Sequence, residues 1–509
     1  MPFDVGGGVL RFTAETLSTD YTGENVYVLT WGDEPPTLRT RLTRSEPAVP
    51  RGFSRVKQST IYLASAPEGT DPWLWDLLFG DGSTWPDSSE PELGQFDLAG
   101  LPSRIEGRVP VRVRFLGRTT HQHNVSASIN GIAVGSLTFT GAVGAVLEGS
   151  VPGSALLASG NRLSINYTAS GGPPGEVGLI YLDSLELGVK LKPQAPVAVD
   201  RVAAFAPYGP LRELDYLILS YGDFLDAARR LADLERSAGY KTAVVDVERA
   251  YDTYSAGIVE AAALRELLKD ATRGGRLKYV LLLGGDTFDT HDYLGTGAVA
   301  FVPSLDAWDG EFGRVPSENR YADLNGDGKP ELAIGRLPAR TAEEAALLVE
   351  KVAAGAFSTD LQLFAVDNQG PSDINFEAEA DSVAGSMPLS DTLFARVQDG
   401  VGVARAALFA GLAQGVAGLH YFGHAGTQQL ADEDLMTVDD MASLDGTPAT
   451  NVFLWACEAQ WYQGIYGRSL GESLLLVPRG GTGQSDLSQD FESTMLASVD
   501  QDTDSGFSR

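Results

Sequence analysis

Two stretches of the sequence, Val416–His424 (VAGLHYFGH) and Thr450–Cys457 (TNVFLWAC), decide the fold class. Each is a short apolar run that ends on a chemically reactive side chain. Short apolar runs without polar alternation are typical of strands that are buried on both faces of a parallel sheet. Similar runs at Tyr216–Ser220, Tyr279–Leu283 and Leu361–Val366 are separated by segments with helical periodicity. The C-terminal part is therefore predicted to be an α/β domain with a mostly parallel sheet.

The first 189 residues show a different pattern. Their β-branched or alternating runs predict short strands at Val109–Phe115, Val125–Ile129, Ile132–Phe139, Arg162–Tyr167 and Gly178–Leu187. Asn130-Gly131 lies between two of these runs and predicts a tight hairpin turn. We therefore expect residues 1–189 to form an all-β, jelly-roll-like sandwich in one or two parts.

The remaining segments complete the predicted organisation. Residues 190–210 are rich in proline and small apolar side chains, which is typical of a linker. Residues 211–481 form the predicted α/β domain. Residues 482–509 are polar and acidic and show no strand pattern, so we expect a disordered tail.

Composition excludes several classes of protein. The 509 residues are 43% hydrophobic, which is enough for two or three domains with their own cores. A net charge of −30 would repel nucleic acid and anionic membranes. No apolar run is long enough to span a membrane, and the opening MPFDVGGGVL lacks the pattern of a signal peptide.

Cys457 and His424 are the candidate catalytic pair. Cys457 is the one cysteine in a chain with five histidines. A loop and a short helix near Thr437–Leu444 separate the two motifs, so the two strands are predicted to be neighbours. Since the carboxyl ends of parallel strands meet at one edge of a sheet, both side chains should lie together there. An imidazole can accept the proton of a thiol, whose ordinary pKa is about 8.5, and so produce a nucleophilic thiolate.

These motifs resemble those of the gingipain-like cysteine peptidases, which share the caspase and legumain architecture. The resemblance covers Tyr216–Gly481 and includes YVLLLGGD, ADLNGDGKPELAIGRLPARTAEEA, YFGHAG, FLWAC and SLGESLLL. It implies that Cys457 is the nucleophile, that His424 is the base and that Asp367 helps to orient the histidine. It also implies a thioester acyl-enzyme, a protein or peptide substrate, and a secreted or cell-surface location.

The sequence departs from the family pattern in two places. Ala425 follows the histidine where the family usually has glycine. The polar run after Gly481 stands where the family continues with an apolar strand that helps to wall the specificity pocket. We therefore expect an incomplete pocket and weak or absent peptidase activity.

A second motif predicts a calcium site. Oxygen-bearing side chains recur at positions 1, 3, 5 and 9 of a loop with glycine at position 6, and a backbone carbonyl would serve at position 7. The predicted ligands are Asp323, Asn325, Asp327, Lys329 (through its carbonyl) and Glu331. The expected ion is structural, and no cofactor is expected for catalysis.

Two other functions stay open on the sequence alone. One is a catalytically inactive, calcium-stabilised protein used for adhesion or binding. The other is a carbohydrate-active protein, which the aromatic-rich β region suggests but for which no carboxylate pair can be named.

Four other histidines and one serine motif are predicted to be structural. His121 and His123 lie in the β region without a partner pattern, and His420 is expected to be packed inside the sheet. His291 lies near Asp289 and Asp292, but without a recognised metal-ligand spacing. The G-x-S-x-G match at 467–471 has neither a preceding apolar strand nor a following histidine.

Overall fold

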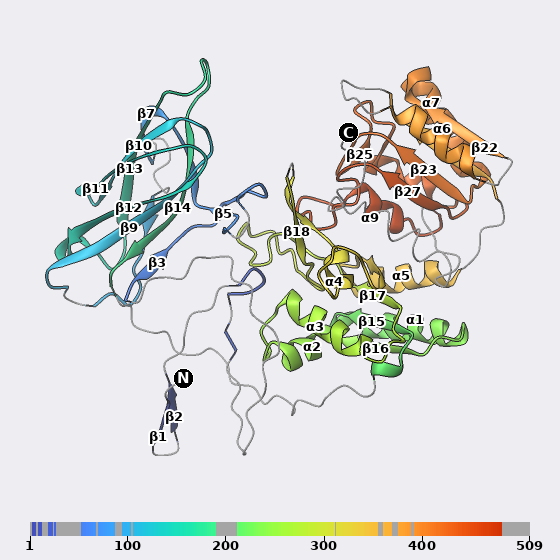
Figure 1. Ribbon diagram of the computed structural model, residues 1–509, viewed down its shortest axis with the longest axis horizontal. Coiled ribbons are helices and arrows are strands. Elements are labelled where there is room, and N and C mark those ends of the chain that lie inside the picture. Colours follow the sequence, from blue (N-terminus) through green and yellow to red (C-terminus); the bar gives the residue numbers. More distant parts are fainter. Residues whose placement is uncertain are drawn as a thin grey trace. The chain divides into compact units, whose positions relative to one another are not determined.

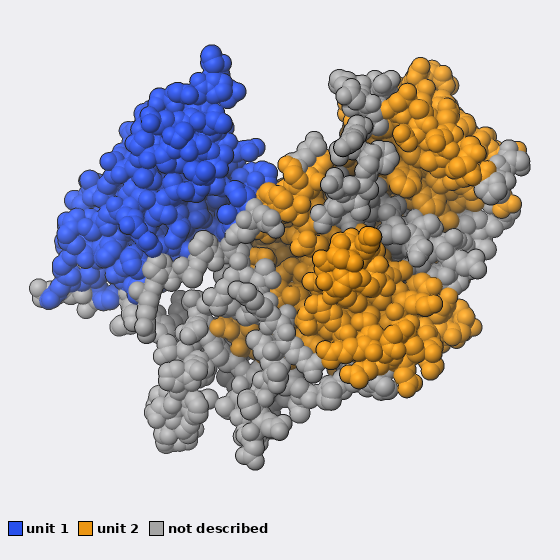
Figure 2. All heavy atoms as spheres, in the orientation of Figure 1, with its two compact units in different colours: residues 1–16, 44–203 blue, residues 17–43, 204–509 orange. Residues whose placement is uncertain are grey.

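A computed structural model describes thirteen stretches of the chain, which divide into two compact units. The described residues are 3–6, 9–12, 19–23, 25–26, 52–67, 70–86, 94–102, 105–189, 211–310, 312–354, 360–368, 375–387 and 391–480. Unit 1 comprises residues 1–16 and 44–203, and unit 2 comprises residues 17–43 and 204–509 (Figure 2). The predicted linker 190–210 and the predicted tail 482–509 lie outside the described residues.

Unit 1 is built from two antiparallel sheets. One has the order β11-β10-β13-β7, with β8 also paired to β13, and the other has the order β12-β9-β14-β3, with β6 also paired to β14 (Figure 1). The strands are β3 Ser54–Val56, β6 Asp76–Phe79, β7 Asp81–Trp85, β8 Gln95–Phe96, β9 Arg108–Gly117, β10 Gln122–Ile129, β11 Ile132–Thr140, β12 Gly144–Pro152, β13 Asn161–Ser170 and β14 Leu179–Leu187. Inward side chains of both sheets share one apolar core. The predicted β-rich character is confirmed, and the jelly-roll order stays a prediction.

The predicted hairpin turn is present between β10 and β11. Ile129 pairs with Ile132, and the two residues between them have φ angles of 52° at Asn130 and 78° at Gly131. Positive φ at both central positions is the geometry that matches the twist of a two-residue hairpin.

The first sheet of unit 2 is fully parallel and has the order β16-β15-β17-β20. Its strands are β15 Tyr216–Ser220, β16 Thr242–Asp246, β17 Tyr279–Leu283 and β20 Ala333–Leu337. Alternate residues of β15 and β17 point into two different cores, one on each face of the sheet. One core also contains helices α2 Val247–Tyr254 and α3 Ala261–Thr272. The other contains α1 Leu225–Ser237 and α5 Ala342–Ala353. Burial on both faces explains why these strands are continuously apolar.

The second sheet of unit 2 is also fully parallel and has the order β22-β21-β23-β27. Its strands are β21 Gln362–Val366, β22 Thr392–Arg396, β23 Gly418–Phe422 and β27 Asn451–Trp455. Helices α7 Val401–Gln414, α8 Met441–Leu444 and α9 Leu470–Leu475 share one of its cores, and α6 Phe376–Ser386 covers the other face. The predicted α/β class is thus confirmed, and the parallel strands are divided between two sheets (Figure 1).

Shorter elements complete the described part of the chain. They are β1 Phe3–Gly6, β2 Val9–Phe12, β4 Ile61–Tyr62, β5 Trp73–Leu74, β18 Asp306–Asp309, β19 Gly313–Pro316, β24 Ala425–Gly426, β25 Gln429–Leu430, β26 Met436–Thr437, helix α4 Asn319–Ala322 and five single turns of 3-10 helix. No helix within the described ranges has the length and apolar character that crossing a membrane would require.

A segment from near the N-terminus, within the predicted β-rich region 1–189, belongs to unit 2. The Tyr21 hydroxyl donates to the carbonyl of Ser304 at 2.8 Å, and Thr290 Oγ1 donates to the carbonyl of Asp20 at 2.6 Å. Tyr21 also packs against the core formed by β15, β17 and α3. These contacts are between residues far apart in the sequence, so no local pattern announces them.

His420 lies inside the second sheet, as predicted for a packed histidine. Its ring is stacked between Phe364 at 4.8 Å and Phe453 at 4.6 Å, on the two neighbouring strands. Its Nε2 lies 3.0 Å from Gln362 Oε1. Burial lowers the pKa of His420 from 6.5 to about 4, because the charged imidazolium is disfavoured there.

The lowered pKa predicts acid sensitivity. The unfolded chain binds a proton at His420 near pH 6.5 and the folded chain does so only near pH 4. The neutral, buried imidazole therefore contributes fully to stability above pH 6.5, and this contribution is lost as the pH falls toward 4. The free energy of unfolding should fall by about 2.5 kcal/mol between pH 7.5 and 4.5 on this account. His420→Phe keeps the stack and should reduce the loss by that amount in denaturant unfolding at the two pH values. An equal loss in both proteins would contradict the assignment.

Candidate active site

The carboxyl edge of the second sheet carries both predicted catalytic residues. In the parallel pairing of β23 with β27, Phe422 stands opposite Trp455. His424 follows Phe422 by two positions, and Cys457 follows Trp455 by two positions. Both residues therefore leave the carboxyl ends of adjacent parallel strands, which is the edge where open α/β sheets bind ligands.

His424 is exposed at this edge, and its backbone is held firmly. The ring of Phe376, the first residue of α6, meets the imidazole edge-on, with 5.1 Å between centroids and an interplanar angle of 90°. The Tyr421 hydroxyl donates to the His424 carbonyl, and the Ala431 amide donates to it at 2.9 Å. Phe376 was not predicted as a site residue, because its segment lacks any catalytic motif.

Asp367 lies beside His424, at the end of β21. Its Oδ2 accepts the backbone N–H of His424 at 3.0 Å, and its Oδ1 accepts the backbone N–H of Asn368 at 2.7 Å. Burial raises the pKa of Asp367, and the two backbone donors oppose this rise. These contacts act on the backbone of the histidine, so Asp367 fixes where the residue leaves the sheet.

Cys457 is half-buried at the start of a tight turn. The Ala459 amide donates to the Cys457 carbonyl at 2.6 Å, and the Trp461 amide donates to the Glu458 carbonyl at 2.9 Å. Glu458 has a φ of 55°, in the left-handed region that residues with a side chain rarely adopt. No sequence signal announces this conformation at a glutamate.

Ala425 adopts an ordinary extended conformation in place of the family's glycine. It lies in β24, where it pairs with Leu430 of β25. Among described residues, positive φ at non-glycine positions occurs at Asn130, Ala256, Asp292, Ala431, Asp434 and Glu458. The absence of glycine at position 425 therefore imposes no backbone strain.

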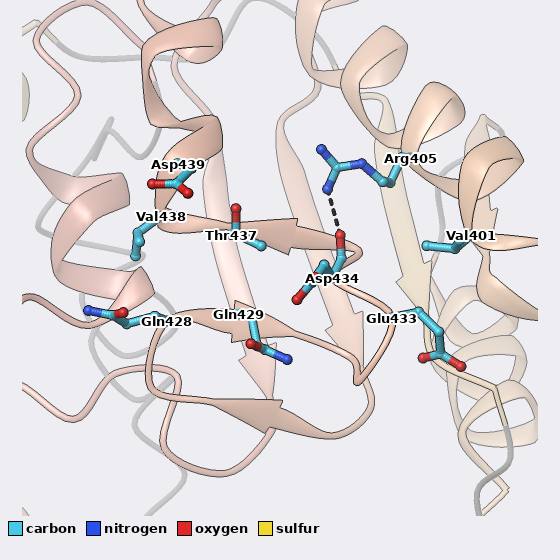
Figure 3. Close-up of a pocket in the computed structure, with 9 residues that line it drawn as sticks. All are labelled: Val401, Arg405, Gln428, Gln429, Glu433, Asp434, Thr437, Val438 and Asp439. Carbon is cyan, nitrogen blue, oxygen red and sulfur yellow. Dashed lines mark hydrogen bonds between the residues drawn. The ribbon is translucent and has the colours of Figure 1, made fainter.

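The segment between His424 and Cys457 was predicted as a loop and a short helix, and it also contains a small antiparallel sheet, β24-β25-β26. A polar pocket of about 500 Å³ lies beside it (Figure 3). Its lining residues are Val401, Arg405, Gln428, Gln429, Glu433, Asp434, Thr437, Val438 and Asp439. The Arg405 guanidinium is already paired with Asp440 at 2.7 Å and donates to the Asp434 carbonyl, and the pocket wall also carries three acidic residues, Glu433, Asp434 and Asp439.

The predicted calcium ligands converge in the loop before β20. One carboxylate oxygen from each of Asp323, Asp327 and Glu331 lies within 4.8 Å of the others, the one such acidic group found among the described residues. Asn325 Oδ1 accepts the Asp327 amide at 2.8 Å, and Asn325 Nδ2 donates to Glu331.

The backbone of this loop arranges the same carboxylates. Asp323 accepts the amides of Gly326 at 2.6 Å and Gly328 at 3.1 Å. Burial alone would raise the pKa of Asp323, but the backbone donors stabilise its carboxylate and the net result is a lowered pKa. Gly326 and Gly328 have φ angles of 83° and 81°, which explains why glycine occupies both positions. The Lys329 amide donates to Asp327 at 2.9 Å, and the Lys329 carbonyl stays the predicted ligand of that residue.

The structure gives the serine motif and His291 structural roles. Ser469 is the N-cap of α9, where its side chain accepts the Glu472 amide and the Glu472 side chain accepts the Ser469 amide in a capping box. His291 Nε2 lies 2.9 Å from the Thr19 carbonyl, and its ring stacks on Tyr293.

The remaining candidates other than Cys457 and His424 are also engaged in the fold. Asp289 accepts two backbone amides at 2.8 Å, and Asp292 accepts one at 2.9 Å, so the carboxylates near His291 serve a loop. His123 Nδ1 lies 2.7 Å from the Tyr167 hydroxyl in the β-sandwich, and His121 is buried there as well.

Comparisons with known proteins give the relatives of the chain. Residues 210–485 match the model of peptidase family C25. No curated protein matched. The solved structures that resemble the chain include a complex of the pro- and mature domains of RgpB from Porphyromonas gingivalis, at 15% identity over 53% of this chain and 62% of that chain with a TM-score of 0.43.

Two further structures show the same level of similarity. Gingipain R matches at 15% identity over 55% of this chain and 63% of that chain, with a TM-score of 0.42. Latent PorU from Porphyromonas gingivalis matches at 16% identity over 59% of this chain and 37% of that chain, with a TM-score of 0.37. The chain spans less than two thirds of the length of each of these structures. The family model covers more than half of the chain, and the chain therefore belongs to peptidase family C25.

Proposed function

We propose that the chain is a cysteine endopeptidase in which Cys457 is the nucleophile and His424 is the general base. The observation that carries this proposal is the register of β23 and β27, which starts both residues from equivalent positions at one sheet edge. Membership of a cysteine peptidase family supports it. The chain holds a single cysteine, so no other residue can provide the thiol.

The proposed reaction proceeds in two stages. The imidazole of His424 takes the proton of the Cys457 thiol, and the thiolate attacks the carbonyl carbon of the scissile peptide bond. The tetrahedral intermediate breaks its C–N bond, the amine leaves with the proton from His424, and a thioester remains. His424 then deprotonates a water molecule, which attacks the thioester and releases the second product and the free thiol.

Two groups support this chemistry. The negative oxygen of the intermediate needs backbone donors, and the amides of Cys457 and of the residues after His424 lie in the segments that leave this edge. Asp367 would act as a positioning residue, since its carboxylate binds the backbone amide of His424 at 3.0 Å. Protein or peptide chains are the proposed substrates, and no cofactor takes part in the reaction.

Substitution of either member of the pair should abolish hydrolysis. The polar run after Gly481 predicts weak activity, so Cys457→Ala and His424→Ala should each lower whatever kcat/KM the wild-type chain shows on a peptide library by ~10³-fold or to the detection limit, because the two residues act as one unit. The matched control is His291→Ala, which removes a histidine of the same unit whose Nε2 faces the Thr19 carbonyl.

A thiol-reactive peptide probe separates this function from a catalytically inactive binding protein. Rapid labelling of Cys457 that depends on His424 is the result expected of a peptidase. Labelling at the rate of an ordinary thiol in wild type and His424→Ala alike would overturn the proposal and favour the inactive protein.

We further propose that the loop Asp323–Glu331 binds a structural calcium ion. Three carboxylates converge in the loop, and calcium prefers oxygen ligands of this kind. Binding to the folded state alone would stabilise unit 2. Millimolar calcium outside cells suits a short surface loop of this kind, which agrees with the proposed secreted or cell-surface location.

Removal of calcium should lower the melting temperature. At a free calcium concentration of about 100 times Kd, the folded state gains about 2.7 kcal/mol relative to chelator. Asp327→Ala should lose this difference, whereas Asp233→Ala, which removes an exposed carboxylate paired with Arg236 on α1, should keep it. Calorimetry in calcium and in chelator measures both. An equal calcium shift in Asp327→Ala and wild type would show that the loop is only a turn.

A further inference from the structure

The turn that follows Cys457 crosses from the second sheet to the first sheet of unit 2. Glu458 holds a left-handed φ of 55° within it. Such a conformation is unfavourable for a residue with a side chain and persists only where the surrounding structure enforces it. Further along the same turn, Tyr462, Gln463 and Gly464 make contacts that hold its far end in place.

Tyr462 is anchored through its hydroxyl. This atom lies 2.6 and 2.7 Å from the two carboxylate oxygens of Glu318 and 3.0 Å from Ser304 Oγ. The Arg336 guanidinium lies over the Tyr462 ring at 4.8 Å and donates to Glu318 at 2.7 Å. All four residues are largely withdrawn from water, where hydrogen bonds to charged groups are strong.

Gln463 and Gly464 are anchored separately. Gln463 Nε2 donates to Asp286 Oδ2 at 2.8 Å, and Gln463 is itself buried. Arg340 Nη2 donates to the Gly464 carbonyl at 3.2 Å and to Glu472 at 2.9 Å. Three consecutive residues are therefore held by four charged side chains: Glu318 and Arg336 at Tyr462, Asp286 at Gln463 and Arg340 at Gly464.

The charged partners of the turn lie in or close to the first sheet in the chain, and none lies in a strand of the sheet that carries Cys457. Asp286 follows β17, Arg336 lies in β20, Arg340 follows β20 and Glu318 immediately precedes α4. The carboxyl edge of one sheet thus holds the turn that leaves the carboxyl edge of the other.

We propose that Asp286, Glu318, Arg336 and Arg340 are positioning residues that aim Cys457 through Tyr462, Gln463 and Gly464. This inference rests on the proposed role of Cys457 as the nucleophile. The first sheet would contribute by holding the strained turn in one conformation, and this turn begins at Cys457, at the sheet edge that His424 shares. A misplacement of about 1 Å can cost about 100-fold in rate, so loss of an anchor has a chemical effect.

The test removes one hydroxyl from the network of the full chain. Tyr462→Phe deletes the bond to Glu318 and keeps the ring under Arg336. Tyr254→Phe is the matched control, since it deletes a buried hydroxyl that donates to the Asp270 carboxylate at 2.8 Å, between α2 and α3. The rate of alkylation of Cys457 by iodoacetamide is measured against pH, together with kcat and KM for peptide hydrolysis.

We expect Tyr462→Phe to move the pH profile of alkylation toward that of an ordinary thiol, with at least a tenfold lower rate near pH 7. It should also lower kcat about 10- to 100-fold with little change in KM. Tyr254→Phe should match wild type in both. Gln463→Met, which removes the amide bound to Asp286, serves as the second variant if Tyr462→Phe does not fold.

The outcomes separate this inference from the proposed function. If alkylation depends on His424 but the anchor variants overlay wild type, the positioning role is overturned and the peptidase function stands. If alkylation does not depend on His424, the proposed function fails, and hydrogen exchange of residues 458–464 decides the anchoring. Faster exchange in Tyr462→Phe than in Tyr254→Phe supports the anchoring, and equal exchange in both overturns it.

Discussion

The parallel pairing of β23 with β27 is the constraint on which the rest of unit 2 depends. Phe422 opposite Trp455 sets where each strand ends, and both chemically reactive residues follow at the same offset. The register is strongly specified because the side chains of β23 are buried on both faces, including His420 between two phenylalanine rings. A slip of one residue would exchange the faces of every side chain in the strand. It would also separate the amide of His424 from the Asp367 carboxylate that accepts it.

The two sheets of unit 2 contribute different things. The second sheet carries Cys457, His424 and Asp367 at its edge, whereas the first sheet supplies buried charges to the turn after Cys457. The positive charge of Arg336 compensates the negative charge of Glu318. The Glu318 carboxylate accepts hydrogen bonds from both the Arg336 guanidinium and the Tyr462 hydroxyl. Asp306 lies in the same region, and its negative charge is not fully balanced by a positive one. Burial and the nearby negative charge of Asp286 therefore raise the pKa of Asp306 to about 7. Breaking a buried pair is costly, so such a network holds one conformation of the turn.

The loop Asp323–Glu331 connects the proposed calcium site to this arrangement. It leads directly into β20, the strand that carries Arg336, and the Arg265 side chain of α3 donates to its Asp323 carbonyl. Carboxylates that converge at one place repel each other without a cation, whereas a bound ion would remove that repulsion. An ion here would thus stabilise the start of the strand whose arginine stacks on Tyr462. The support of the turn after Cys457 would then extend from the loop through β20.

The sequence by itself determined the two classes of unit, the strands β15, β17, β21, β23 and β27, the Asn130-Gly131 hairpin and the convergence of the carboxylates in the Asp323–Glu331 loop. Each depends on local chemistry, such as a continuous apolar run, a residue pair that tolerates positive φ, or oxygens at fixed spacing. The edge strand β22 was not predicted, because its side chains are only partly buried and its apolar run ends at Arg396. Only the tertiary structure decided the division into two sheets, the place of Tyr21 in unit 2, the edge-on contact of Phe376 with His424, and the anchors of Tyr462 and Gln463. The physical reason is that these contacts join residues far apart in the chain, whose attraction exists only after both sheets have formed.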